Sequence, residues 1–165
     1  MSRGFVKEDD QEETPIIPPR AALPASAINY VTPQGLLQLS AEKDSLEQER
    51  GALKTEDEQQ RRRDLALING KLDLLIERIT SARVINPMEQ PKHDIRFGAK
   101  VKIKMNETLQ QFQIVGVDEA DVTKRKIAFV APIAKAITGK KVGETVNFSL
   151  GAEIRKIEII KIAYS

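Results

Sequence analysis

The chain has 165 residues, of which 41% are hydrophobic, 30% charged and 4% aromatic, and its formal net charge is +2. It contains no cysteine and a single histidine, His93, which excludes disulfides, thiolate chemistry, cysteine-ligated zinc and multi-histidine metal sites. No apolar run reaches the roughly 18 residues that a membrane-spanning helix requires, and the composition predicts no catalytic residue, metal or cofactor.

Residues 1–30 are predicted to be a leader without regular structure. Five acidic residues within 8–13 precede four prolines within 15–24, and closely spaced prolines oppose both helices and central strands. This composition favours a disordered or extended segment. The alternative is a peptide that docks along a partner, with Ile16 and Ile17 as its anchors.

A helix is expected to begin at Thr32 and Pro33. Threonine is a good N-cap, and proline at the first helical position gives up an N–H that would be unpaired anyway. Leu39, Leu46 and Leu53 then recur at intervals of seven residues. This spacing predicts one half of a coiled coil.

A second heptad helix is expected after a turn at residues 51–55. It would begin at a capping box formed by Thr55 and Glu58 and run to about Arg83. Its apolar positions are Leu65, Ile68, Leu72, Leu75, Ile79 and Ala82. Two such helices joined by a short turn predict an antiparallel coiled-coil finger over residues 31–86. The alternative is a dimeric coiled-coil adaptor.

Prolines mark a linker at residues 87–94, after which the hydrophobic period changes from 3.5 to 2. A short helix is expected over Pro132–Ile137, with Gly139 as its stop. The candidate strands lie near residues 101–105, 112–117, 127–130, 146–148 and 154–162. The sequence therefore predicts an α+β fold in which the finger precedes a small, mostly antiparallel sheet domain, residues 95–165, that carries one short helix.

Charge is distributed unevenly between the two parts. Residues 91–165 carry 14 basic and 8 acidic side chains, net +6, whereas residues 1–90 carry 12 and 16, net −4. Such an asymmetry suggests separate electrostatic tasks, but the basic excess is too mild for a dedicated DNA-binding protein.

Several stretches resemble the Gre family of bacterial transcription elongation factors. Residues 114–121, IVGVDEAD, look like the family's I-V-G-x-D-E-A-D, and residues 131–144, APIAKAITGKKVGE, resemble its S-P-L-A-R-A-L-L-G-K-K-V-G-D. Residues 30–36, YVTPQGL, are similar to its opening Y-L-T-x-E-G-L, and residues 82–85 match the end of its second helix. The resemblance covers roughly residues 29–163 and implies an FKBP-like C-terminal domain behind the finger.

The resemblance also implies RNA polymerase as the partner. Members of the family hold the rim of the polymerase secondary channel with the C-terminal domain and project the finger down the channel, close to nascent RNA. The residues expected to bind the polymerase are Ala131, Pro132, Ile133, Ala134 and Asp121. Ala131 stands where the family usually has serine. The alternative is that Ile133 and Ile137 simply pack the short helix onto the sheet.

The fingertip departs from the family pattern. Cleavage-stimulating members carry a tip motif close to G-D-L-S-E-N-A-E-Y, whose acids are thought to help place a magnesium ion, and this chain has no such motif. Residues 33–85 are also about 14 residues shorter than the family stretch, which corresponds to about 10 Å of lost reach for the finger. The fingertip candidates here are Glu56, Asp57, Glu58, Arg61, Arg62 and Arg63.

Two interpretations are open for each fingertip group. The acids fit a helix cap and the helix dipole, or a relocated set of Mg²⁺ ligands. The arginines fit a solvated, salt-bridged helix face, or contact with RNA phosphates.

The sequence therefore predicts a monomeric, cytoplasmic, polymerase-binding regulator of transcription elongation that is not an enzyme and does not stimulate transcript cleavage. One alternative is an active cleavage factor that uses Glu56 and Asp57. Another, from a different class, is an FKBP-like peptide-binding or prolyl isomerase module, which would need a deep pocket walled by aromatic side chains.

Overall fold

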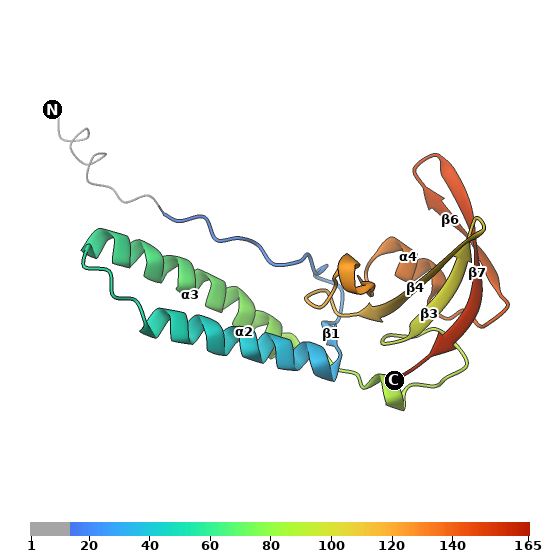
Figure 1. The fold of residues 1–165 in the computed structure, drawn as a ribbon, viewed down its shortest axis with the longest axis horizontal. Coiled ribbons are helices and arrows are strands. Elements are labelled where there is room, and N and C mark those ends of the chain that lie inside the picture. The colour runs from blue at the N-terminus through green and yellow to red at the C-terminus, as the bar shows by residue number, and fades with distance from the viewer. Residues whose placement is uncertain (1–13) are drawn as a thin grey trace.

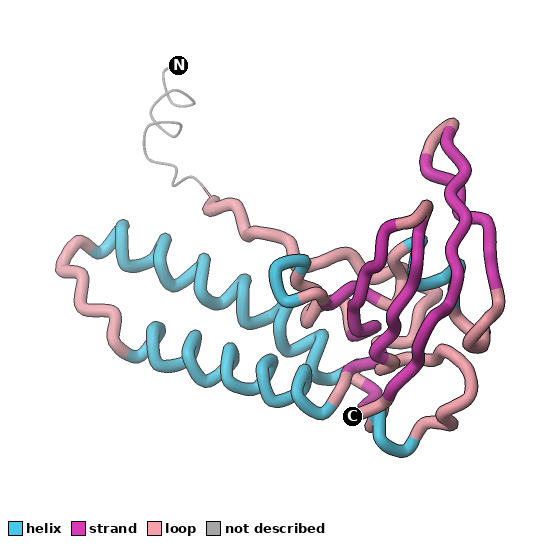
Figure 2. Tube along the Cα trace, turned by 45° about the vertical axis from the view of Figure 1, so that its right-hand side comes forward, coloured by secondary structure: helices cyan, strands magenta, loops and turns pink. Residues whose placement is uncertain are grey.

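The chain folds into a helical hairpin joined to a curled five-stranded sheet, as seen in a computed structural model that describes residues 14–165 (Figure 1). The hairpin extends away from one end of the sheet domain, and both views show the two parts meeting at the hairpin base (Figure 2). The predicted α+β fold, a hairpin followed by a small sheet domain, is confirmed. Among the described residues, no helix has the length and apolar character needed to cross a bilayer.

The hairpin consists of α2 (Pro33–Gly51) and α3 (Glu58–Ser81). Helix α2 begins as predicted, because the Thr32 hydroxyl accepts a hydrogen bond from the Gly35 amide at 3.0 Å and proline occupies the first turn. The heptad positions of both helices meet between them. The buried apolar residues of this core are Val31, Leu39, Leu46, Ile68, Leu72 and Leu75.

The start of α3 differs from the prediction. The N-cap is Asp57, whose carboxylate accepts hydrogen bonds from the amides of Gln59 at 3.0 Å and Gln60 at 3.3 Å. The predicted capping box of Thr55 and Glu58 is wrong, since aspartate caps a helix at least as well as threonine and lies closer to the helix. Helix α2 also runs on to Gly51, so the connection is residues 52–57.

The end of α3 differs for another reason. The helix stops at Ser81 because Arg83–Val84 forms β2, which pairs in parallel with β1 (Tyr30–Val31). The Arg83 amide donates to the Asn29 carbonyl at 2.8 Å. This two-residue ladder ties the start of α2 to the end of α3, and it is too short to leave a hydrophobic period in the sequence.

The sheet has the strand order β5-β4-β3-β7-β6 and is antiparallel except for the β4–β5 pair. Its strands are β3 (Lys100–Met105), β4 (Thr108–Val115), β5 (Lys126–Ala128), β6 (Thr145–Leu150) and β7 (Glu153–Ala163). Strand β5 ends before the predicted Val130, because the chain turns and the Ala131 amide donates to the Ala128 carbonyl at 2.9 Å. Two short 3-10 helices, η1 (Pro87–Glu89) and η2 (Val122–Lys124), lie in the connections.

Helix α4 (Pro132–Ile137) covers one face of the sheet. Ile137 of α4 is fully buried together with Ile103 of β3 and Ile157 of β7. Along β3 the alternate residues Lys100, Lys102 and Lys104 face away from this core, as the period of two predicts. The outer face of the sheet is therefore polar and basic.

The described part of the leader, residues 14–29, contains no helix or strand and runs beside α3 (Figure 1). The Ile17 side chain lies against Gly70 of α3, where a Cβ atom would clash with it. Arg78 of α3 donates a hydrogen bond to the Ala21 carbonyl at 2.5 Å. The predicted acidic stretch at the start of the leader lies outside the described residues.

Candidate functional site

The hairpin and the sheet domain are joined through a buried carboxylate in the loop after β4. Glu119 is 7% exposed, and its two oxygens accept hydrogen bonds from the Thr32 amide at 3.1 Å and the Thr32 hydroxyl at 2.5 Å. The Gly116 amide donates to the same carboxylate at 3.3 Å. Because Thr32 also caps α2, one residue both starts the helix and anchors the sheet domain.

Glycine is required beside this carboxylate. A Cβ atom at Gly35, in the first turn of α2, would collide with the side chain of Glu119. A Cβ atom at Gly116 would lie 2.6 Å from the Tyr30 carbonyl oxygen. Both glycines therefore allow the loop to approach the hairpin base closely.

An ion-pair network lies next to this joint. Asp118, whose side chain is 6% exposed, accepts hydrogen bonds from Arg20 Nε at 3.0 Å and from Arg78 Nη1 at 3.1 Å. Arg20 also pairs with Glu42 of α2 at 2.6 Å. The hydrogen bond that Arg20 donates to Glu42, followed by the charge of Asp118, raises the pKa of Arg20 above its usual value. Leader, hairpin and sheet domain thus converge on one carboxylate.

Sequence reasoning found the IVGVDEAD motif but not this role for it. Asp118 and Glu119 were part of the family resemblance, whereas Arg20 and Arg78 carried no signal. Single charged residues that lie 98 and 40 positions from Asp118 in the chain show no periodicity that could reveal the pairing.

Three aromatic rings pack together at the same end of the sheet domain. The ring centroid of Tyr30 lies 5.7 Å from that of Phe97 and 5.6 Å from that of Phe129, and the two phenylalanine rings are 5.6 Å apart. These tilted and edge-to-face arrangements are favourable for aromatic pairs. The aromatic side chains therefore contribute to the contact between the hairpin base and the sheet domain.

Helix α4 presents the residues expected to bind the polymerase. Ala131 occupies the N-cap with an extended backbone and no side-chain cap, and Pro132 follows at the exposed first position. Ile133 is half-buried against the core, while Ala134 and Ile137 are fully buried. The buried positions fix the helix on the sheet and leave Pro132 pointing outward.

Asp121 lies at the start of η2, where it is the N-cap residue. Its carboxylate accepts hydrogen bonds from the Thr123 hydroxyl at 2.6 Å and the Thr123 amide at 3.0 Å. The hydroxyl hydrogen bond is the main reason that the pKa of Asp121 lies below its usual value. Asp121 is thus a negative charge held at the start of η2, where its backbone pairs with Lys126 of β5.

Two of the three fingertip acids, Asp57 and Glu58, interact with α3 itself. Asp57 caps the helix, and Glu58 pairs with Arg61 at 3.6 Å, with both side chains largely exposed. Glu56 and Arg62 are exposed, and Arg63 is half-buried. Within residues 14–165, no group of three or more acidic, histidine or cysteine side chains is arranged to hold a metal ion.

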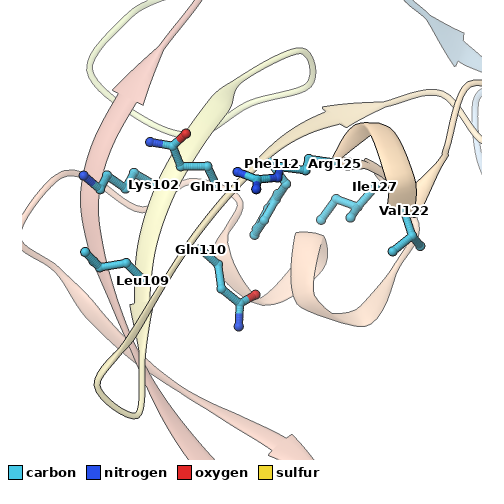
Figure 3. Close-up of a pocket in the computed structure, with 8 residues that line it drawn as sticks. All are labelled: Lys102, Leu109, Gln110, Gln111, Phe112, Val122, Arg125 and Ile127. Atoms are coloured by element: carbon cyan, nitrogen blue, oxygen red, sulfur yellow. The ribbon is translucent and has the colours of Figure 1, made fainter.

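A hollow lies beside the outer edge of β4 (Figure 3). Leu109, Val122 and Ile127 supply apolar surface, and Val122 is 87% exposed. Lys102 and Arg125 contribute cations at the rim of the hollow. The lining contains no acidic or histidine side chain that could act as an acid or base.

Comparison with known proteins gives a consistent family match. Residues 90–164 match the model described as "Transcription elongation factor, GreA/GreB, C-term". The chain is 37% identical over 101 residues to the transcription elongation factor GreA of Thermodesulfovibrio yellowstonii, an alignment that covers 60% of this chain and 64% of that protein. It is 36% identical over 100 residues to GreA of Neisseria meningitidis, covering 59% and 63%. The chain thus spans slightly less than two thirds of the length of these relatives.

Solved structures were also found to be similar. The GreA factor homolog 1 (Gfh1) of Thermus thermophilus aligns at 19% identity with a TM-score of 0.38, covering 83% of this chain and 99% of the other. The GreA/GreB factor of Nitrosomonas europaea aligns at 18% identity with a TM-score of 0.38, covering 82% and 98%.

Proposed function

We propose that this chain is a transcription elongation factor of the GreA/GreB type that binds RNA polymerase, because residues 90–164 match the C-terminal model of that family. The observation that carries this proposal is the family match over residues 90–164, which takes in almost the entire sheet domain. The protein acts by binding as a single copy, and any chemistry takes place in the polymerase.

The proposed contact with the polymerase rim is the exposed start of α4. Pro132 is held outward by the burial of Ala134 and Ile137 beneath it, so the surface that it offers is rigid before binding. A preorganised apolar contact loses little conformational entropy when a partner covers it. Ile133, half-buried in the same turn, would flank this contact, and Asp121 at the start of η2 is a further residue expected to bind.

The proposed role of the hairpin is to occupy the secondary channel without stimulating cleavage. Helix α2 has 19 residues and α3 has 24, about 28 and 36 Å at 1.5 Å per residue, and α3 extends further toward the tip of the finger (Figure 1). At the tip, Asp57 is used as a helix cap and Glu58 is paired with Arg61. Metal–oxygen distances tolerate errors of only a few tenths of an ångström, so a shorter finger without free paired acids would not place a magnesium ion.

The surface assignment is tested by measuring the affinity for core RNA polymerase. We expect Pro132→Asp to weaken binding at least about tenfold, because it places a charge in an apolar contact. Aspartate is well tolerated in the first turn of a helix, so α4 should persist. Val142→Asp, at a 57% exposed position outside α4, is the matched control and should bind as the wild type does.

The two parts of the proposal fail in different ways. If the wild-type protein does not bind core polymerase, the proposed function is wrong. If the wild type binds and Pro132→Asp binds equally well, the function stands and the contact lies elsewhere.

A further inference from the structure

Six cations gather on the outer face of the sheet, opposite the face that α4 covers. We call this surface the basic face; its members are Lys100, Lys102, Lys124, Arg125, Lys126 and Lys161. They come from β3, from β7 and from the η2–β5 turn, and they surround a shallow hollow. Figure 3 shows Lys102 and Arg125 on either side of Gln111 at the edge of this surface.

The strand register places these charges against one another. Lys102 of β3 lies directly opposite Lys161 of β7, and its other neighbour is Gln111 of β4. Like charges directly opposite each other on neighbouring strands destabilise a sheet. The Lys102–Lys161 pair therefore does not stabilise the fold. This indicates that the two cations serve to bind an anion.

Among the described residues, the cations of the basic face lack direct ion pairs, although the charge of Lys124 acts on Asp121 at its edge. Within the described part of the chain, none of its six cations forms an ion pair. The nearest acids mark its limits: Lys104 at one end pairs with Glu107 at 3.5 Å and lies opposite Glu158. At the other edge the carboxylate of Asp121 is engaged by Thr123.

We propose that the basic face binds the phosphate backbone of duplex DNA without sequence preference. From β5 to β7 the surface spans three strand spacings, about 14 Å, and its two rows of side chains lie about 7 Å apart along β3. Duplex DNA carries one charge per roughly 1.7 Å of its axis, so a surface of this size faces several phosphates. The amide of Gln111 lies between the cations and can donate to a phosphate oxygen, whereas that of Gln113 donates to the Gly98 carbonyl at 3.3 Å.

A duplex fits this face better than a single strand does. Proteins that bind single strands stack the bases on exposed aromatic rings. The aromatic residue of this surface, Phe112, is 9% exposed and packs into the core. Contacts to the backbone of a duplex need only cations and hydrogen-bond donors. This face lies opposite α4, so the inference does not rest on the proposed polymerase contact.

The test is the salt dependence of binding to a fluorescent duplex of about 20 base pairs, measured by anisotropy with the full chain from about 20 to 200 mM salt. Each phosphate contact contributes about −0.9 to the slope of log K against log salt. The triple variant Lys102→Gln/Arg125→Gln/Lys161→Gln should therefore reduce the magnitude of the slope by about 2.7. It should also weaken binding at least about 100-fold at 50 mM salt.

A matched control separates the basic face from total charge. The variant Lys135→Gln/Lys140→Gln/Lys141→Gln removes three cations elsewhere on the same domain and should keep the wild-type slope. A Lys102→Arg/Lys161→Arg variant should bind as the wild type does. The thermal midpoint of the glutamine variant should not fall, since it relieves the repulsion between residues 102 and 161.

Four results would overturn the proposal. The first is that the wild type does not bind the duplex at about 20 mM salt. The second is an unchanged slope of log K against log salt in the triple variant. The third is that the control variant loses as much duplex binding as the triple variant does. The fourth is tighter binding of single-stranded RNA or of polyglutamate than of the duplex. Normal binding of core polymerase by the triple variant would show that its loss of DNA binding is separate from the proposed function.

Discussion

Glu119 is the residue on which the contact between the two parts of the molecule depends most. Replacing it with alanine leaves the Thr32 amide and hydroxyl buried without an acceptor. A buried unsatisfied polar group costs about 1–3 kcal/mol, so we expect Glu119→Ala to lower the free energy of unfolding by about 3 kcal/mol. Urea denaturation followed by circular dichroism measures this change.

The control for that measurement is another glutamate outside the joint. Glu153 is exposed and pairs with Arg155 at 3.3 Å, so Glu153→Ala should change the stability by less than about 1 kcal/mol. Equal effects of the two substitutions would contradict the role assigned to Glu119.

Tyr164 makes stability depend on pH in the alkaline range. Its hydroxyl donates to the Asp94 carbonyl at 2.6 Å and accepts from the Arg96 amide at 2.8 Å. Partial burial raises its pKa, so the folded state favours the neutral phenol. This stabilisation is complete below the pKa of the unfolded chain and is lost as the pH rises through the folded pKa.

We therefore expect the thermal midpoint of the wild type to fall more steeply at alkaline pH than that of Tyr164→Phe. Thermal denaturation of the two proteins across the alkaline range measures this difference. Parallel curves would show that Tyr164 does not contribute to the pH dependence.

At the scale of single residues, sequence reasoning succeeded where a residue acts on its own helix. The cap at Thr32 followed from local chemistry alone, and the packing of Ile137 onto the sheet was one of the two alternatives left open for α4. It failed at Asp57, because two good capping residues two positions apart compete and the local sequence does not rank them. It could not foresee the second role of Thr32, whose partner lies 87 residues away.

The described leader is the element whose contacts differ most from the expectation for a Pro-rich segment. Arg20 connects it to both Glu42 of α2 and Asp118 of the sheet domain. We expect Arg20→Ala to lower the free energy of unfolding by about 1–2 kcal/mol, since the nearly buried carboxylate of Asp118 loses one of its two cations. Urea denaturation again provides the measurement.

Arg61→Ala is the comparison for this variant. It removes a largely exposed pair with Glu58 within one helix and should cost less than about 0.5 kcal/mol. If Arg20→Ala is equally mild, the contacts of the leader do not stabilise the fold.

Elements with a sustained period were predictable, and short or irregular ones were not. The hairpin followed from its heptads and β3 from the alternation of lysines with apolar residues. The parallel β1–β2 ladder has two residues in each strand, and residues 14–29 have no repeat, so neither leaves a pattern in the sequence. Their structure is determined by contacts between distant segments.

The whole molecule separates its proposed tasks in space. The hairpin extends from one end of the sheet domain (Figures 1 and 2). Helix α4 covers one face of the sheet, and the basic face lies opposite. The ion pairs of Asp118 and the hydrogen bonds of Glu119 hold the hairpin to the domain. Such a connection would keep the direction of the finger fixed relative to the proposed polymerase contact.

The central claim is that this factor binds RNA polymerase and leaves cleavage of the transcript unstimulated. The most direct measurement is the rate of 3′-end cleavage in a backtracked complex with Mg²⁺, with the protein added at saturation and a long-fingered family member as positive control. We predict that cleavage proceeds at the rate that the polymerase shows without added protein. Faster cleavage with the wild type would contradict this prediction. Loss of that stimulation both in Glu56→Ala/Asp57→Ala and in Asp57→Asn, which keeps the helix cap but not the carboxylate, would assign it to the fingertip acids.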